Sequence, residues 1–174
     1  DDIIRAIDWV VTGSRARVIN MSFGGYIPEG DELIEYENSL QAAYNAGIIL
    51  IASSGNYQSL EPTFVRYPAS SMYTIAVGAT KEDDTRTGFS CYGTNLDIVA
   101  PGENILTVYR NFLDLYKEVD GTSFSAPIVS GLAALILSQN PELTNDQVKS
   151  VIIESADKVA GMNGLNYHAE YGYG

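Results

Sequence analysis

The chain has little cysteine, histidine or positive charge. Its 174 residues include one cysteine, Cys91, and one histidine, His168. A single cysteine excludes an internal disulfide framework and leaves the redox compartment open. There are 10 Lys and Arg residues against 22 Asp and Glu residues, which gives a net charge of −12. This charge argues against nucleic acid or an anionic membrane surface as a partner, because both would repel the chain.

Long apolar runs are also missing. The longest extends from Ile128 to Leu137 and is interrupted by Ser130. It falls well short of the roughly 20 residues that cross a bilayer, so it predicts a core helix and no membrane span. Hydrophobic residues make up 45% of the chain and charged residues 18%. This composition and length predict one folded domain over residues 1–174.

The apolar pattern predicts alternating helices and strands. Helical spacing is expected over 1–12 and 33–46, after the serine-rich stretch at 121–127, and over 145–155 behind a capping box. Short buried strands are expected at 18–21, 48–52, 74–79 and 96–100, a hairpin at 105–109 and 115–119, and a loop over 162–174. Such alternation predicts an α/β fold with a mostly parallel sheet and helices on both faces. Ligands of such sheets bind beyond the carboxyl ends of the strands.

One stretch, Gly121 to Pro127, delivers a serine to the start of the apolar run. Free backbone N–H groups and the positive end of the helix dipole favour developing negative charge there, which suits a nucleophile. The following residues are apolar on every side, which predicts a helix buried along its length. Taken alone, however, a serine before an apolar helix is more often an N-cap.

Asn56 and the segment 22–25 follow two of the expected strands. A side-chain amide beyond a strand end can donate to a transition-state oxyanion, although an asparagine after glycine is more often a turn residue. Gly24 and Gly25 remove side chains that would block the approach of another backbone. A plain exit from the strand is the alternative interpretation of this segment.

Five blocks in this order resemble the subtilisin-like serine proteases and cover nearly the whole chain. They are Val18–Gly25, the stretch from Ala46-Gly47-Ile48 through Ser54-Gly55-Asn56, Tyr67-Pro68-Ala69 leading to Thr74–Ala79, Phe89-Ser90 through Asp97–Gly102, and Gly121-Thr122-Ser123-Phe124-Ser125-Ala126-Pro127. The resemblance implies a serine endopeptidase of that family acting on protein or peptide substrates. It also favours a secreted or cell-surface location.

The resemblance assigns roles to particular residues. Ser123 would be the nucleophile, and Asn56 an oxyanion donor together with the backbone N–H of Ser123. The substrate cleft would be lined by Ser22, Phe23, Gly24 and Gly25 and by Ser53, Ser54 and Gly55. No cofactor is required. Many members of the family bind calcium, but Asp97 alone does not make an oxygen cage, so a calcium site is unsupported.

A serine hydroxyl needs a base to take its proton, usually a histidine oriented by an acid. His168 follows Ser123, whereas subtilisins run Asp, His, Ser along the chain. No block resembles the family's Asp-Thr-Gly or His-Gly-Thr motifs. We therefore expect the serine-bearing, C-terminal part of the catalytic domain, incomplete at its N-terminus and also at its C-terminus. The catalytic Asp and His would lie on an upstream segment, and this chain alone would be inactive.

Two other interpretations are open. An α/β-hydrolase could use Ser123, Asp146 or Asp157, and His168, although that fold has a glycine two residues after the serine where this chain has Ser125. A pseudoprotease or binding domain could have kept the sheet and lost the histidine and aspartate. The presence of both Ser123 and Asn56 argues against such decay.

Overall fold

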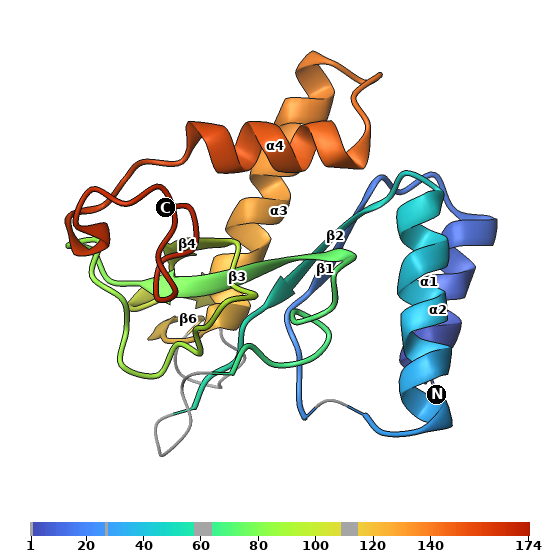
Figure 1. Cartoon of the computed structure of the whole chain (residues 1–174), viewed down its shortest axis with the longest axis horizontal. Coiled ribbons are helices and arrows are strands. Elements are labelled where there is room, and N and C mark those ends of the chain that lie inside the picture. Colours follow the sequence, from blue (N-terminus) through green and yellow to red (C-terminus); the bar gives the residue numbers. More distant parts are fainter. Residues whose placement is uncertain (1, 27, 58–63, 109–114) are drawn as a thin grey trace.

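The computed structural model describes residues 2–26, 28–57, 64–108 and 115–174. A four-stranded parallel sheet forms its centre, in the order β1-β2-β3-β4 (Figure 1). The strands are β1 (Val18–Met21), β2 (Ile49–Ser53), β3 (Thr74–Thr80) and β4 (Ile98–Pro101). In register, Ile19 pairs with Leu50, Ile51 with Ile75, and Val77 with Ile98. The predicted parallel α/β sheet is confirmed, and the bounds of β2, β3 and β4 differ by one or two residues from those expected.

Helices cover both faces of this sheet, because successive strand residues point to opposite sides. Leu50 and Ala52 of β2 belong to a buried cluster with α1 (Asp2–Gly13) and α2 (Asp31–Asn45). Ile49 and Ile51 belong to a second cluster with α3 (Thr122–Gln139) and α4 (Asn145–Ser155). Burial of β2 on both faces explains the unbroken apolar run from Ile49 to Ala52.

The prediction that the central helix is buried along its length is wrong. Helix α3 contacts all four strands of the sheet, and its buried residues include Ala126, Val129, Ala133 and Leu137. On its other side Ile128 is 45% exposed, Leu132 40% and Leu135 66%. A sheet covers only one side of a helix, and in the described part of the chain no second layer covers the other.

By length and composition α3 could cross a membrane. Its packing against every strand of the sheet instead makes it the core helix of this domain. The predicted capping box before α4 is confirmed. Gln147 N donates to Thr144 Oγ1 over 3.2 Å, and Thr144 N donates to Gln147 Oε1 over 2.9 Å.

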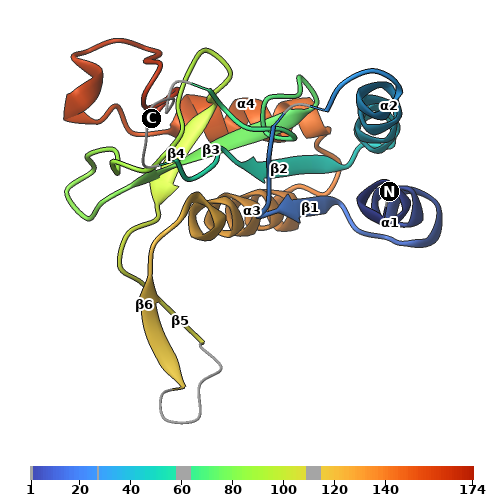
Figure 2. The ribbon, with the colours of Figure 1, turned by 90° about the horizontal axis from the view of Figure 1, so that it is seen from below.

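The predicted hairpin forms from β5 (Ile105–Val108) and β6 (Tyr116–Val119), which pair antiparallel. It projects away from the sheet (Figure 2). Position 109, expected to end its first strand, lies outside the described residues. The C-terminal segment has no long element beyond the short 3₁₀ turn η1 (Ala160–Met162), as predicted. It lies along β4, where Val99 N donates to Gly174 O over 3.0 Å.

Candidate active site

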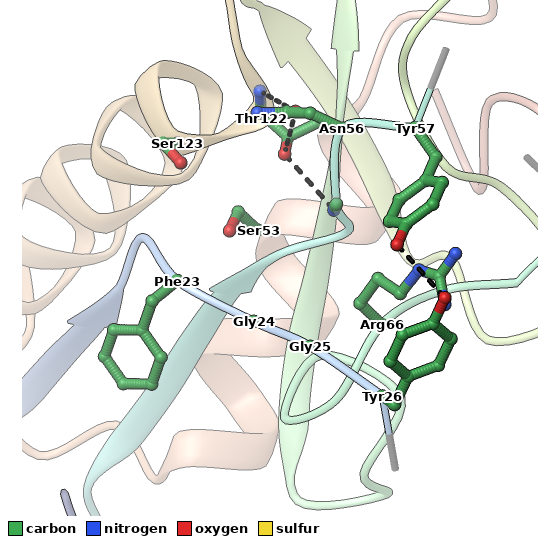
Figure 3. Close-up of a pocket in the computed structure, with 11 residues that line it drawn as sticks. Phe23, Gly24, Gly25, Tyr26, Ser53, Asn56, Tyr57, Arg66, Thr122 and Ser123 are labelled. Atoms are coloured by element: carbon green, nitrogen blue, oxygen red, sulfur yellow. Dashed lines mark hydrogen bonds between the residues drawn. The ribbon is translucent and has the colours of Figure 1, made fainter. Parts of the chain in front are cut away.

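A pocket of about 390 Å³ opens where β1 and β2 end and α3 begins (Figure 3). Neighbouring parallel strands place their carboxyl ends at one edge of a sheet, and the N-terminus of α3 reaches the same edge. Residues from four chain segments line the pocket: Phe23, Gly24, Gly25, Tyr26, Ser53, Gly55, Asn56, Tyr57, Arg66, Thr122 and Ser123. Ser123 and Asn56, predicted to act together, therefore share one cavity.

Ser123 sits in the first turn of α3 and is partly buried. Its Oγ donates to the backbone oxygen of Ser22 over 3.1 Å. In return, Ser22 Oγ donates to the backbone oxygen of Ser123 over 2.7 Å. Within the described residues no hydrogen bond joins Ser123 Oγ to an imidazole or a carboxylate. The hydroxyl is therefore held in place, but no described base takes its proton.

The orientation of Asn56 is fixed by Thr122. Asn56 Oδ1 accepts from Thr122 N over 2.8 Å and from Thr122 Oγ1 over 2.7 Å. A backbone N–H can only donate, so the amide oxygen must face Thr122 and the Nδ2 donor must face the other way. Thr122 Oγ1 also accepts from Gly55 N over 3.2 Å. Two hydrogen bonds thus hold the Asn56 amide beside Ser123, and a third holds the Thr122 hydroxyl that makes one of them.

Gly121 precedes Thr122 with φ at 155°, a backbone conformation that side chains rarely adopt. A β-carbon at this position would lie 3.1 Å from Asn56 Nδ2. The glycine therefore gives α3 its abrupt start and leaves room for the amide.

Most of the predicted cleft residues line the pocket, but Ser54 does not. Ser54 is fully buried, and its N–H donates to Val77 O over 2.9 Å. The alternation of side chains at the end of β2 explains this difference from the expected lining, because it turns Ser53 toward α3 and Ser54 toward the opposite side. Ser22 contacts Ser123 through the two hydrogen bonds described above rather than by lining the cavity.

Four residues of the pocket were not predicted as site residues: Tyr26, Tyr57, Arg66 and Thr122. Thr122 is adjacent to Ser123, so its position in the motif could have singled it out. Arg66 comes from a loop held by its N–H, which donates to Ser54 O over 2.8 Å. Its guanidinium carbon lies 4.8 Å from the ring centre of Tyr26 and 4.0 Å from that of Tyr57. No local sequence pattern marks such a three-residue cluster.

Comparison with known proteins agrees with this geometry. A family model described as the subtilase family, Peptidase S8, matches residues 1–174. The chain belongs to the subtilase family. It is 36% identical over 155 residues to subtilisin DY of Bacillus licheniformis, covering 88% of this chain and 54% of that protein. It is 39% identical over 155 residues to subtilisin E of Bacillus subtilis strain 168, covering 88% and 39%.

Two solved structures resemble this subtilase chain. The prenylagaramide maturation protease PagA matches with a TM-score of 0.82 and 30% identity, over 99% of this chain and 63% of that one. A protease from Pseudoalteromonas arctica matches with a TM-score of 0.79 and 25% identity, over 90% and 52%. The chain thus spans 54% of subtilisin DY and 39% of subtilisin E, both shares of well under two thirds.

The structure does not bring His168 to Ser123 in this subtilase. His168 Nδ1 accepts from Glu170 N over 3.2 Å, and the imidazole packs against Tyr171. Asp146 accepts a short hydrogen bond from Tyr44. An α/β-hydrolase would need contacts that join Ser123, an acid and His168. The described contacts of Ser123, Asp146 and His168 do not join these side chains to one another.

Cys91 is buried behind the pocket, where its N–H donates to Gly55 O over 2.9 Å. Burial raises the pKa of its thiol, and the neighbouring Arg66 guanidinium only partly opposes this. The thiol is therefore neutral near pH 7 and is a poor nucleophile.

No cluster of three or more His, Cys, Asp or Glu side chains suited to a metal ion occurs among the described residues of this subtilase. Asp97 has structural partners instead. Its carboxylate accepts from Ala76 N over 2.9 Å and pairs with Lys149 Nζ over 2.8 Å. A calcium site at Asp97 gains no support from these contacts.

Proposed function

We propose that this chain is the serine-bearing part of a serine endopeptidase that hydrolyses peptide bonds through an acyl-enzyme on Ser123. The observation that carries the proposal is the convergence of Ser123 and an oriented Asn56 amide on one pocket at the start of α3. Membership of the subtilase family supports the same reaction. A secreted or cell-surface location, favoured by the family, stays a prediction.

We assign one step of the reaction to each group. Ser123 Oγ attacks the carbonyl carbon of the scissile bond, and its proton passes to a base. The carbonyl oxygen becomes negative as the tetrahedral intermediate forms. Asn56 Nδ2 and the backbone N–H of Ser123 donate to this oxygen, and the positive end of the α3 dipole favours its charge. Collapse of the intermediate releases the amine, which takes the proton from the base, and water then hydrolyses the acyl-enzyme.

We assign the base and its orienting acid to an upstream segment outside residues 1–174. Three features support this assignment. The described residues bring no base to Ser123, strand β1 has an unpaired edge in the described sheet, and α3 has the uncovered apolar side formed by Ile128, Leu132 and Leu135. An apolar groove of about 320 Å³ also runs between α1 and β1. A segment that completes the sheet would cover such surfaces.

Covalent labelling of the native protein with a fluorophosphonate, together with casein hydrolysis, tests the proposal. We expect labelling and hydrolysis by the native protein and neither by residues 1–174 alone. Ser123→Ala should abolish both the labelling and the hydrolysis. Ser138→Ala, which removes an exposed hydroxyl at the far end of the same helix, should leave both unchanged.

Two results would contradict the assignment. Hydrolysis by residues 1–174 alone that is lost in both Ser123→Ala and His168→Ala would favour the α/β-hydrolase. A folded native protein that is neither labelled nor active would favour a non-catalytic binding domain.

A further inference from the structure

Among its described lining residues, the pocket beside Ser123 has one cationic side chain and no carboxylate. The cation is Arg66, which is 6% exposed. Its Nε has no hydrogen-bond partner in the described part of the chain. In Figure 3 the guanidinium lies between Tyr26 and Tyr57, across the pocket from Ser123.

A buried guanidinium is normally paired, because removing its charge from water is costly. Here the described neighbours are neutral. Tyr26 and Tyr57 contact the guanidinium through their rings, and their hydroxyl oxygens lie 3.1 Å apart in a hydrogen bond. The Cys91 side chain also interacts with the guanidinium, and burial raises the pKa of its thiol, so this neighbour is neutral as well. In a chain with a net charge of −12, the lack of a described acidic partner at this position marks a place for an outside anion.

The aromatic contacts also restrict what that anion can be. Contact with two rings fixes the plane of the guanidinium, so its N–H donors lie in a rigid fork along its edge. That edge matches the two oxygens of a carboxylate. The pocket is lined by both Ser123 and Arg66. The pocket therefore has room for a peptide whose carbonyl carbon is at Ser123 and whose side chain at that same residue extends toward Arg66.

We propose that Arg66 makes this pocket selective for a substrate residue with an acidic side chain, Asp or Glu, immediately before the scissile bond. This inference rests on the proposed endopeptidase function. Arg66 is then a residue that determines specificity, while Ser123 and Asn56 act on the peptide bond itself. Gly55 leaves space for the Arg66 side chain, because a β-carbon at position 55 would lie 2.5 Å from Arg66 Cγ.

The test uses the native protein and four peptides that differ only at the residue before the cleaved bond: Glu, Gln, Leu and Lys. We expect kcat/KM for the Glu peptide to exceed that for the Gln peptide by about 10- to 100-fold, the discrimination that one buried charged contact provides. The comparison needs no variant, so it remains decisive even if substitutions at Arg66 prevent folding.

Variants locate the preference. Arg66→Gln should remove the advantage of Glu over Gln while Ser123 remains labelled by a fluorophosphonate, and Arg66→Glu should shift the preference toward Lys. Arg15→Gln is the control for Arg66→Gln, because it removes one positive charge at an exposed position outside the pocket. It should keep the preference for Glu.

The outcomes separate the two proposals. Equal cleavage of the Glu and Gln peptides, or an acidic preference unchanged in Arg66→Gln, overturns the role of Arg66 and leaves the endopeptidase intact. If none of the four peptides nor casein is cleaved and Ser123 is not labelled, the endopeptidase proposal itself fails, and this inference fails with it.

Discussion

Ser22 supplies a hydrogen bond that helix α3 cannot make for itself at Ser123. In an α-helix the Ser123 carbonyl would accept from the N–H four residues later, but that residue is Pro127, which has no N–H. Ser22 Oγ donates to this carbonyl over 2.7 Å instead. The return bond from Ser123 Oγ to Ser22 O ties the end of β1 to the start of α3. The proline thus leaves an acceptor that joins two parts of the candidate site.

Removing that donor should destabilise the domain. We expect Ser22→Ala to lower the free energy of unfolding by about 1–2 kcal/mol, because a partly buried carbonyl loses its donor. The cost should shrink in the Pro127→Ala background, where the helix regains a backbone N–H for Ser123. Urea denaturation of both single variants and the double variant measures this coupling.

Ser138→Ala is the matched control for this double-mutant comparison. The Ser138 hydroxyl donates to a backbone carbonyl at the exposed end of α3 and does not contact Pro127 or Ser22. Its small effect should add to that of Pro127→Ala without coupling. An identical cost of Ser22→Ala in both backgrounds would show that Ser22 does not compensate for the proline.

Buried Tyr36 predicts a loss of stability at alkaline pH. Its side chain is 5% exposed, and burial, with a smaller contribution from Glu32, raises its pKa from 10.0 to about 12. Its contribution is fully present below pH 10. It is lost as pH rises toward 12, because the unfolded chain releases the phenolic proton first. The shift corresponds to a loss on the order of 2–3 kcal/mol.

Urea denaturation between pH 9 and pH 12 measures this loss. Tyr36→Phe should make the decline of unfolding free energy shallower over that range. The exposed Tyr116 provides the comparison, since Tyr116→Phe should leave the slope of the wild-type protein unchanged. A Tyr36→Phe variant that loses stability as steeply as the wild type would contradict the assignment.

Much of the fold follows from the sequence because its elements are strongly periodic. The run from Ile49 to Ala52 is apolar on both faces, and a parallel strand covered by helices on both sides requires that pattern. The parallel sheet then predicts that residues after β1 and β2 meet at one edge. This rule brings Asn56 near the segment 22–25, whereas the expectation that Asn56 acts beside Ser123 comes from the resemblance to the subtilisin-like proteases.

Other features depend on contacts that no local pattern encodes. Both sides of α3 consist largely of apolar residues, so composition alone predicts burial for Leu135 and Ala133 alike. In the structure Ala133 is buried and Leu135 is exposed. Ser54 is expected from the sequence to line the cleft with its neighbours Ser53 and Gly55, and only the actual pleat decides that its side chain faces the other way. Arg66 enters the pocket through one backbone hydrogen bond to Ser54 and through contacts with the rings of Tyr26 and Tyr57, and none of these residues is adjacent to it in sequence.

The hydrogen bonds of Thr122 to Asn56 predict a division of labour in the complete enzyme. Asn56 donates only after charge has moved to the carbonyl oxygen, so Asn56→Ala should lower kcat about 100- to 1000-fold, the range measured for the loss of one such donor in a subtilisin. KM should change little, because the interaction forms in the transition state. Thr122→Val keeps the backbone bond to Asn56 and loses only the hydroxyl, so a smaller fall in kcat of about 10-fold is expected.

Steady-state kinetics of the single and double variants tests whether Thr122 acts through Asn56. If Thr122 only positions the Asn56 amide, Thr122→Val should lower kcat no further in the Asn56→Ala background, where the amide is absent. Thr122→Ser, which retains a hydroxyl, should restore most of the wild-type kcat. An undiminished effect of Thr122→Val in the Asn56→Ala background would give Thr122 a role of its own. A rise in KM at constant kcat for Asn56→Ala would make Asn56 a ground-state binding residue, because a donor that serves the oxyanion alone has no means of changing substrate affinity.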